Sequence, residues 1–405
     1  MTTQTPLKYP VFDLKTRANP QAVYNQMRES DPIWCAHGPE TGNPIWFFVD
    51  YEDVVAVLKD DKRFIKDARR LPREIAQRYI NLDPDPVWDT INGHMLMRDA
   101  PDHTRLRRLV HKVFTPRAIQ ALLPRIEEIA DNLLDQMAGQ HTADLINAYT
   151  FPLPITVIAE MLGVESEKRD KFREWTNILL FSPDPTQNQT AAMEFVMYVN
   201  QLIEQREQED TGDILSGLVR AEEEGDSLNR QELLSMVFLL LVAGHETTVN
   251  LMGNGMLTLM QNPQQFELLR QQPEWIDSAV EEMLRFNGPV ETPTMRFALE
   301  TVEYKGHVIK QGDLILPSLL GANRDPKVFE HPNTFDITRD PNPHVAFGMG
   351  VHYCVGAPLA RLEAKIALSK LIARYPNMAL NTAIDNLEWN GSLLIHGMKS
   401  LPITY

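Results

Sequence analysis

Cysteine is scarce in this sequence, which has only Cys35 and Cys354 among its 405 residues. Two cysteines can supply neither a disulfide framework nor a metal site of four thiolates, so we expect a reducing compartment. Basic residues are also in the minority, because 39 Lys and Arg against 55 Asp and Glu leave a formal net charge of −16. Nucleic-acid binding needs a basic footprint for the phosphates, so this composition excludes a general nucleic-acid-binding protein.

Long apolar runs are missing as well. The longest, residues 236–243, is far shorter than the ~18–20 residues that cross a membrane. The N-terminus has no basic segment followed by an apolar one, so no signal peptide is predicted. No internal repeat and no low-complexity linker divides the chain. We therefore expect a cytoplasmic monomer without membrane contact, folded as one domain over residues 1–405.

Helical patterns dominate the middle of the chain. A strand is predicted over residues 45–49 with a helix over 51–58 behind it, and a further helix begins near Asp99 and Pro101. Apolar residues recur with the helical period in later segments, namely 116–137, 154–162 and a pattern that starts at Asp226 or Ser227 and persists to about residue 261. At 1.5 Å per residue this last helix is ~50 Å long and must cross the whole molecule.

The last third of the chain changes character. We expect helices over residues 274–286 and 356–373, separated by short strands (292–298, 308–309 and 313–316) and by a meander rich in proline and asparagine (323–343). The final twenty residues read as a hairpin with Asn390–Gly391 at its turn. The fold class predicted is therefore mainly α with a smaller β portion.

Residues 347–356, FGMGVHYCVG, carry the most chemical information. A lone cysteine is usually an inert core thiol, but Cys354 lies among three glycines, which allow tight turns and close approach to a flat ligand. It also precedes a helix, whose unpaired amides and positive dipole end lower the pKa of a thiol and hold a thiolate. A single thiolate suits zinc poorly and suits one axial position of a porphyrin-bound iron well.

The pattern Phe-Gly-x-Gly-x-His-x-Cys-x-Gly in these residues resembles the haem-binding loop of the cytochrome P450 superfamily. Further matches extend the resemblance from about residue 94 to the C-terminus. It implies a single cytochrome P450 fold with haem b between the long central helix and the helix that follows the cysteine loop. Cys354 would be the iron ligand, and the other cofactor contacts from this loop would be Phe347, Gly348, His352 and Gly356.

Residues 243–248, AGHETT, interrupt the most apolar run with an acid and two hydroxyl groups. Buried polar groups need partners, so the cluster is costly unless it meets a ligand, water or a carbonyl four residues earlier in the helix. The segment resembles the oxygen-activation motif of the same superfamily. That resemblance implies that Ala243 and Gly244 leave room for dioxygen and that Glu246 and Thr247 manage the protons. His245 receives no role.

Glu282 and Arg285 form a Glu-x-x-Arg pair, but so do Glu267 and Arg270. Taken alone, either is an ordinary ion pair on an exposed helix face. The later copy leads into residues that match the superfamily pattern. The resemblance implies that Glu282, Arg285 and Arg339 of the meander form a buried structural network.

Two haem carboxylates need cationic donors. His103 and Arg107 are spaced i,i+4 and therefore share one helix face, which without the cysteine loop would simply be a solvated face. The resemblance implies that both bind the haem propionates together with Arg296 and His352. Glu291 is either a polar anchor for a substrate or an outward-facing strand residue.

The activity implied is that of a haem-thiolate monooxygenase, which inserts one atom of O2 into a C–H bond or an alkene of a hydrophobic small molecule (polyketide or macrolide, terpenoid or steroid, or fatty acid). The sequence has no flavin or nicotinamide fingerprint and no iron–sulfur cysteine set. A ferredoxin with its NAD(P)H-dependent reductase is therefore expected as electron donor. Two alternatives stay open, a hydrogen-peroxide-driven peroxygenase and a non-catalytic haem protein.

A candidate surface for the ferredoxin lies in residues 98–117, where six basic and two acidic side chains give a local net charge of +4. Electron carriers of this kind are usually acidic, so a basic patch would attract them in spite of the negative total charge. Within this segment Arg105, Arg108 and Lys112 are expected on the side of the helix away from the propionates.

Overall fold

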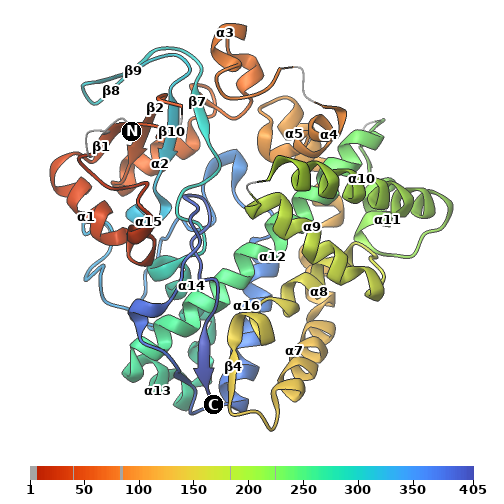
Figure 1. Cartoon of the computed structure of the whole chain (residues 1–405), viewed down its shortest axis with the longest axis vertical. Helices are drawn as coiled ribbons and strands as arrows, with labels where there is room; N and C mark the ends of the chain where they lie inside the picture. Colours follow the sequence, from red (N-terminus) through yellow and green to blue (C-terminus); the bar gives the residue numbers. More distant parts are fainter. Residues whose placement is uncertain (1–6, 40, 83–84, 183, 224) are drawn as a thin grey trace.

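The computed structural model describes residues 7–39, 41–82, 85–182, 184–223 and 225–405. One long helix, α12 (Arg230–Gln261), runs through the middle of the molecule (Figure 1). Its 32 residues span ~48 Å. The predicted start at residue 226 or 227 is wrong, because the chain there forms a short strand and the helix is capped at Asn229.

The cap of α12 is reciprocal. The side-chain oxygen of Asn229 accepts a hydrogen bond from the backbone amide of Glu232 at 3.0 Å, and the Glu232 carboxylate accepts one from the Asn229 amide at 2.9 Å. This capping box satisfies two of the free amides that every helix start leaves. The prediction of Asp226 or Ser227 as the start missed this cap at Asn229.

By length and hydropathy α12 is the one helix in the described part of the chain that could cross a membrane, but 67% of its apolar window is buried inside the molecule. A helix that is apolar on all sides belongs in the centre of a large core. The helices with the most extensive packing on α12 are α4 (Pro86–Asn92), α8 (Pro152–Met161), α14 (Ile276–Asn287) and α16 (Ala357–Arg374), which supply much of that core.

The remaining helices surround this centre. In chain order they are α1 (Pro20–Ser30), α2 (Tyr51–Lys59), α3 (Arg73–Ala76), α5 (Asp102–Val113), α6 (Pro116–Ala121), α7 (Leu123–Met137), α9 (Arg169–Phe181), α10 (Pro185–Gln208), α11 (Ile214–Val219), α13 (Pro263–Gln271) and α15 (Leu319–Ala322). The single helix expected over residues 116–137 is two helices. Pro124 has no amide hydrogen to continue the α6 ladder and instead sits in the first turn of α7.

The largest sheet joins strands from the N-terminal part of the chain with strands from residues 296–317. Its strand order is β1 (Ile33–His37), β2 (Pro44–Phe48), β10 (Leu314–Pro317), β7 (Arg296–Ala298) and β3 (Phe64–Ile65). β2 pairs antiparallel with β1 and parallel with β10, with Trp46 opposite Ile315. Figure 1 shows this sheet and α1 on one side of α12, and α7 to α11 on the other. The strand predicted over residues 292–298 is shorter than expected, since only its last three residues join the sheet.

Three smaller sheets complete the β portion: β11 (Ala379–Leu380) with β12 (Pro402–Thr404) and β4 (Thr142–Asp144), β5 (Glu222–Glu223) with β6 (Asp226–Ser227), and β8 (Val302–Tyr304) with β9 (His307–Ile309). The expected two-residue turn at Asn390–Gly391 is wrong. The Asn390 amide bonds to the Gly397 carbonyl at 2.9 Å, so the loop spans residues 391–396. That loop is held instead by the chain after α14, where the Glu291 amide bonds to the Leu394 carbonyl at 3.0 Å.

Glu291 is completely buried, which contradicts both roles considered for it. One carboxylate oxygen accepts a hydrogen bond from Arg17 at 2.7 Å, and the other accepts one from the Tyr24 hydroxyl at 2.5 Å. Burial raises the pKa of Glu291, against the opposing charge of Arg17. The side chain therefore fastens the N-terminal segment to the end of α14 and is not available to a substrate. The fold as a whole confirms the predicted class, mainly α with a smaller β portion.

Candidate active site

The cysteine loop lies between the meander and α16, and its shape depends on glycine. Gly348 and Gly350 both have positive φ, +71° and +72°. A Cβ on Gly350 would also lie 2.8 Å from the carbonyl oxygen of Leu58 at the end of α2. The Cys354 amide donates to the Phe347 carbonyl at 3.0 Å and closes the loop. The glycine pattern in the sequence therefore reflects backbone geometry that other residues adopt only with strain.

The Cys354 thiol lies at the start of α16, as the sequence predicts. Burial raises its pKa, while the backbone amides of Gly356 and Ala357 and the charges of Arg107 and Arg361 pull that pKa down. The expected net lowering is wrong for the thiol of the chain alone, because burial outweighs the donors. The same donors would stabilise the thiolate once a cation faces it.

In the middle of α12 the residues are less buried than in most of the helix. Ala243 is exposed, and Gly244 and Thr247 are partly exposed, although almost every neighbour along the helix is buried. The Thr247 hydroxyl donates to the Ala243 carbonyl at 2.9 Å. This is the back-bonded geometry that the sequence left open as the alternative for the cluster. No described side chain covers Ala243 in the centre of the molecule.

Glu246 is buried at 7% exposure on the neighbouring face of the same turn. Its Oε1 lies 3.5 Å from Nε2 of His245, which is completely buried. The other ring nitrogen of His245 lies 2.8 Å from the Leu241 carbonyl. His245, for which the sequence suggested no role, therefore contacts the acid of the cluster.

Glu282, Arg285 and Arg339 are brought together as predicted. Arg285 donates to both oxygens of Glu282 at 2.7 Å, and both side chains have zero exposure. Arg339 of the meander donates to the same carboxylate at 3.2 Å. Arg285 also donates to the carbonyls of Asn323, Pro332 and Thr334. The network thus ties α14 to the meander that leads into the cysteine loop.

His103, Arg296 and His352 converge from α5, β7 and the cysteine loop. The rings of His103 and His352 have centroids 4.2 Å apart. Burial and the neighbouring positive charges lower the pKa of His352 to about 2. Burial lowers the pKa of Arg296 to about 10, and its Nη1 has no hydrogen-bond partner among the described residues. These three basic residues form a buried cluster in which Arg296 makes no ion pair among the described residues, and the low pKa of His352 leaves that ring uncharged at neutral pH.

Arg107 is the fourth residue predicted to bind the propionates, and its side chain donates hydrogen bonds to the backbone of the cysteine loop. It donates to the carbonyls of Val351 at 3.0 Å and Tyr353 at 2.6 Å, on either side of His352. Lys66 is a member that the sequence analysis missed. It is buried at 2% exposure, and its charge lowers the pKa of His352. Nothing in the segment FIKDARR distinguishes it from the arginines that follow, because a lysine next to an aspartate is usually solvated.

The basic segment of α5 differs from expectation in one residue. Arg105 forms ion pairs with Glu232 and Asp226, so its charge is balanced by the start of α12. Arg108 and Lys112 are exposed, and Lys112 donates to the Glu222 carbonyl at 2.7 Å. Arg108 and Lys112 are thus the members of the predicted surface whose side chains reach solvent most.

Comparison with known proteins decides what these features belong to. Residues 154–397 match the family model for cytochrome P450. The chain belongs to the cytochrome P450 family. It is 43% identical to the polyketide biosynthesis cytochrome P450 PksS of Bacillus subtilis, over 95% of this chain and 96% of that one. It is also 44% identical to the cytochrome P450 monooxygenase PikC of Streptomyces venezuelae, over 98% of this chain and 94% of that one.

A solved structure of similar sequence agrees. The myxobacterial cytochrome P450 CYP267B1 in complex with myristic acid superimposes with a TM-score of 0.92 at 43% identity, covering 98% of each chain. The resemblance stated from the motifs is confirmed, and so is the cytochrome P450 fold. The protein is a cytochrome P450 monooxygenase whose cofactor is a haem iron.

The residues of this P450 fit that cofactor. Cys354 offers a sulfur surrounded by positive groups and amide donors. Ala243 leaves a central surface of α12 uncovered by side chains. Arg296 keeps an unpartnered buried donor inside a cluster of positive groups, and two carboxylates would supply the anion that such a cluster lacks.

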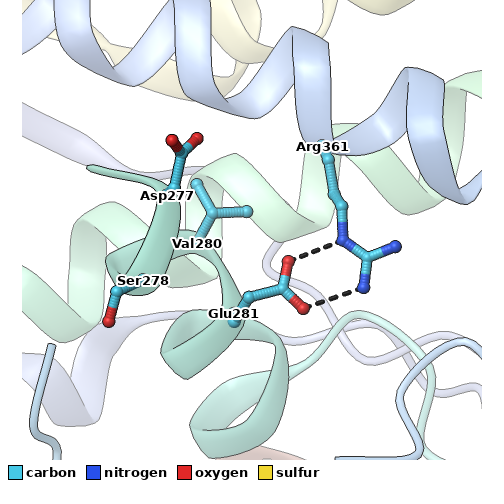
Figure 2. Close-up of a pocket in the computed structure, with 5 residues that line it drawn as sticks. All are labelled: Asp277, Ser278, Val280, Glu281 and Arg361. Carbon is cyan, nitrogen blue, oxygen red and sulfur yellow. Dashed lines mark hydrogen bonds and ion pairs between the residues drawn. The ribbon is translucent and has the colours of Figure 1, made fainter. Parts of the chain in front are cut away.

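A second acid of α14, Glu281, holds three elements together. Arg361 of α16 donates to both oxygens of Glu281, at 2.6 and 2.8 Å (Figure 2). Nε2 of His344 lies 2.8 Å from the same carboxylate, and the Arg361 guanidinium stands 4.5 Å from the Phe347 ring centre. Burial alone would raise the pKa of Glu281, but Arg361 and His344 outweigh it and hold the pKa at about 2.

The two Glu-x-x-Arg pairs allow a matched test of the network. Glu282→Gln leaves the buried Arg285 without its counter-charge, so we expect the free energy of unfolding to fall by about 3–5 kcal/mol. Glu267→Gln breaks the exposed pair of α13, 2.8 Å long, and should cost less than about 1 kcal/mol. Urea unfolding of both holoproteins measures the difference. Equal losses in the two variants would contradict a structural role for Glu282.

Glu281 predicts a pH dependence. Its pKa in the folded protein, about 2, lies below the ordinary 4.5, so its interactions stabilise the protein above pH 4.5 and are lost as the pH falls toward 2. Wild type should therefore have a higher melting temperature than Glu281→Gln at pH 7, and the gap should narrow below pH 4.5. Asp277→Asn, in the exposed pair with Lys365, is the control and should show no comparable narrowing. A gap that is constant between pH 7 and pH 3 would refute the assignment.

Proposed function

We propose that this P450 inserts one oxygen atom from O2 into a C–H bond or an alkene of a hydrophobic small molecule, as a single domain formed by residues 1–405. The observation that carries the proposal is the uncovered Ala243–Thr247 surface of α12 in a chain that also holds Cys354 at the start of α16. Polyketide, terpenoid and fatty-acid compounds are the proposed substrate classes. Two of these classes are supported by relatives, because PksS is a polyketide biosynthesis cytochrome P450 and CYP267B1 was solved in complex with myristic acid.

We assign Cys354 as the iron ligand and haem b as the cofactor. When bound, the haem would supply reductive activation of dioxygen, and the Cys354 thiolate would hold its iron and support that chemistry. Phe347, Gly348 and Gly356 shape the loop around the sulfur, and Ala243 and Gly244 keep the opposite side free of bulky groups. His103, Arg107, Arg296 and His352 are assigned to the cofactor carboxylates. Glu282, Arg285 and Arg339 act only on the fold.

Glu246 and Thr247 are the proposed proton-handling pair. A hydroxyl has one proton and two acceptor sites, so Thr247 can donate to a reacting group while it accepts from water or acid. The carboxyl group of Glu246 lies buried one residue away, with Nε2 of His245 at 3.5 Å. Because Thr247 now donates to the Ala243 carbonyl, its hydroxyl must rotate away from that carbonyl to act. The apolar residues before Ala243 on α12 limit the access of bulk water.

This pair separates the proposal from its rivals. A peroxygenase receives its protons with the peroxide and has no need of an acid–threonine pair. A non-catalytic haem protein needs neither the pair nor the small residues Ala243 and Gly244. Both rivals are therefore less consistent with the sequence around Thr247.

The proposed electron donor is a ferredoxin with its NAD(P)H-dependent reductase, acting on a cytoplasmic monomer. The basic charge of Arg108 and Lys112 supports an acidic partner on this face of α5, because opposite charges steer association. Arg105 is left out of the surface, since it is paired with Glu232.

Spectroscopy and coupling test the reaction. The reduced holoprotein with carbon monoxide should give a strongly red-shifted Soret band, which Cys354→Ala should abolish. General acid–base groups contribute ~10²–10⁴-fold in rate, so Thr247→Val should lower product formation by ~10²-fold while oxygen consumption continues.

Thr248→Val is the matched control, because that neighbouring hydroxyl makes the same kind of back-bond, to the Gly244 carbonyl at 3.3 Å. It should leave the ratio of product to oxygen consumed close to that of wild type. A reduced protein with an unshifted Soret band, or equal losses in the two threonine variants, would overturn the proposal.

The partner surface has its own test. Arg108→Glu with Lys112→Glu should slow ferredoxin-driven turnover ~10-fold at low salt, less so at high salt, because steering by exposed charges is screened. Haem content and substrate-induced spectral shifts should not change. Lys15→Glu with Lys168→Glu, also exposed, makes the same change in net charge elsewhere. If both double variants lose the same activity, the surface is not where the donor binds.

A further inference from the structure

Lys66, the residue directly after β3, is a basic residue that is almost completely buried and forms no ion pair among the described residues. Its exposure is 2%, and its Nζ donates to the Thr294 carbonyl at 2.5 Å and to the Thr294 hydroxyl. Within the described ranges no carboxylate forms an ion pair with this ammonium. A buried lysine in that position either loses its proton or meets an anion that the chain does not supply.

Asp99 is the acid whose charge acts on Lys66, but its carboxylate already binds other groups. Its two oxygens accept the backbone amides of Lys66 at 2.9 Å and Asp67 at 3.0 Å, and Arg70 lies 3.3 Å from one of them. Asp99 therefore fixes the backbone at Lys66 and leaves the side chain free to extend toward Thr294.

Other positive groups lie in the same region. Burial lowers the pKa of Lys66 far below its usual value, and the charge of Arg296 lowers it further. The charges of Lys66, Arg296 and Arg107 all act on the ring of His352. Arg296 is itself buried at 2% exposure with an unpartnered Nη1. Such an arrangement repels itself unless negative charge enters the middle of it.

Two carboxylates together accept several hydrogen bonds, so a further donor has acceptor oxygens to meet. Arg107 already gives one proton of each terminal nitrogen to the carbonyls of Val351 and Tyr353, which leaves one proton on each nitrogen for a carboxylate. An ammonium has three protons, and Lys66 uses two of them on Thr294, which leaves one donor unspent. Thr294 stands two residues before Arg296, so the contact keeps the ammonium close to that guanidinium in the chain.

We propose that Lys66 is a further carboxylate-binding residue of this site, which takes one of the two carboxylates of the haem together with Arg296. The proposal rests on the proposed haem site and deepens it. The cofactor would then be fastened from α5, β7 and the cysteine loop, and also from the N-terminal part of the chain through β3. Lys66 thereby links retention of the cofactor to a segment outside every motif of the sequence.

The test is retention of haem by the holoprotein. Loss of a charge-assisted hydrogen bond should speed transfer of haem from Lys66→Met to excess apomyoglobin by ~10-fold or more. Lys62→Met, an exposed lysine four residues earlier, is the control and should transfer haem at the wild-type rate. Lys66→Arg keeps the charge and should lie close to wild type. Equal transfer rates in Lys66→Met and wild type would overturn the proposal.

Two further measurements keep the result unambiguous. The Soret band of reduced Lys66→Met with carbon monoxide should stay red-shifted. If the haem-thiolate assignment itself is wrong, the wild-type protein will lack the red-shifted band as well. If Lys66→Met does not fold, Lys66→Gln is compared with Lys66→Arg, and the proposal falls if they lose haem equally fast.

A carboxylate could also come from the substrate. If Lys66→Met keeps its haem but no longer binds myristic acid more tightly than myristyl alcohol in spectral titrations, the proposal is overturned in favour of a substrate anchor.

Discussion

The buried carboxylate of Glu282 is the interaction on which the active site depends. It binds Arg285 within α14 and Arg339 from the meander, and it also accepts the amide of Asp336 at 2.9 Å. A meander without regular secondary structure has few backbone hydrogen bonds of its own, so charged anchors must fix its path. The cysteine loop begins where this path ends. Thus an acid that touches no substrate decides where the Cys354 sulfur lies.

Charge balance distinguishes the two sides of the site. On one side Arg285, Arg339 and Arg361 all meet a carboxylate, that of Glu282 or Glu281. On the other side Lys66 and Arg296 form no ion pair with any described residue. An unpaired buried charge costs more free energy than a paired one. The side with Lys66 and Arg296 is therefore stabilised when an anionic ligand binds there. The protein chain and its cofactor are in this sense one electrostatic unit.

The sequence predicted what local chemistry encodes. Cys354 with its glycines, the AGHETT cluster and the helical periods around them follow from backbone and burial rules, and the structure agrees with most of the resulting elements. Contacts between distant segments were beyond those rules. Glu291 meets Arg17, Arg105 meets Glu232, and Lys66 meets Thr294, and each pairing is created only by the fold. The predicted start of α12 is wrong for a local reason, because Asn229 caps the helix and the earlier Asp226 does not.

The pairing of β2 with β10 has a consequence for the order of synthesis. Trp46 and Ile315 face each other in the sheet, so β2 can pair with β1 early, but its other edge must wait until the last third of the chain has left the ribosome. At ~5–20 residues per second that delay is on the order of 15–50 s. Over this interval one edge of β2 has no partner strand, and unpaired edges of apolar strands invite pairing with other chains. A nascent chain of this protein is therefore most vulnerable to aggregation at its beginning, although the region that performs the chemistry lies near its end.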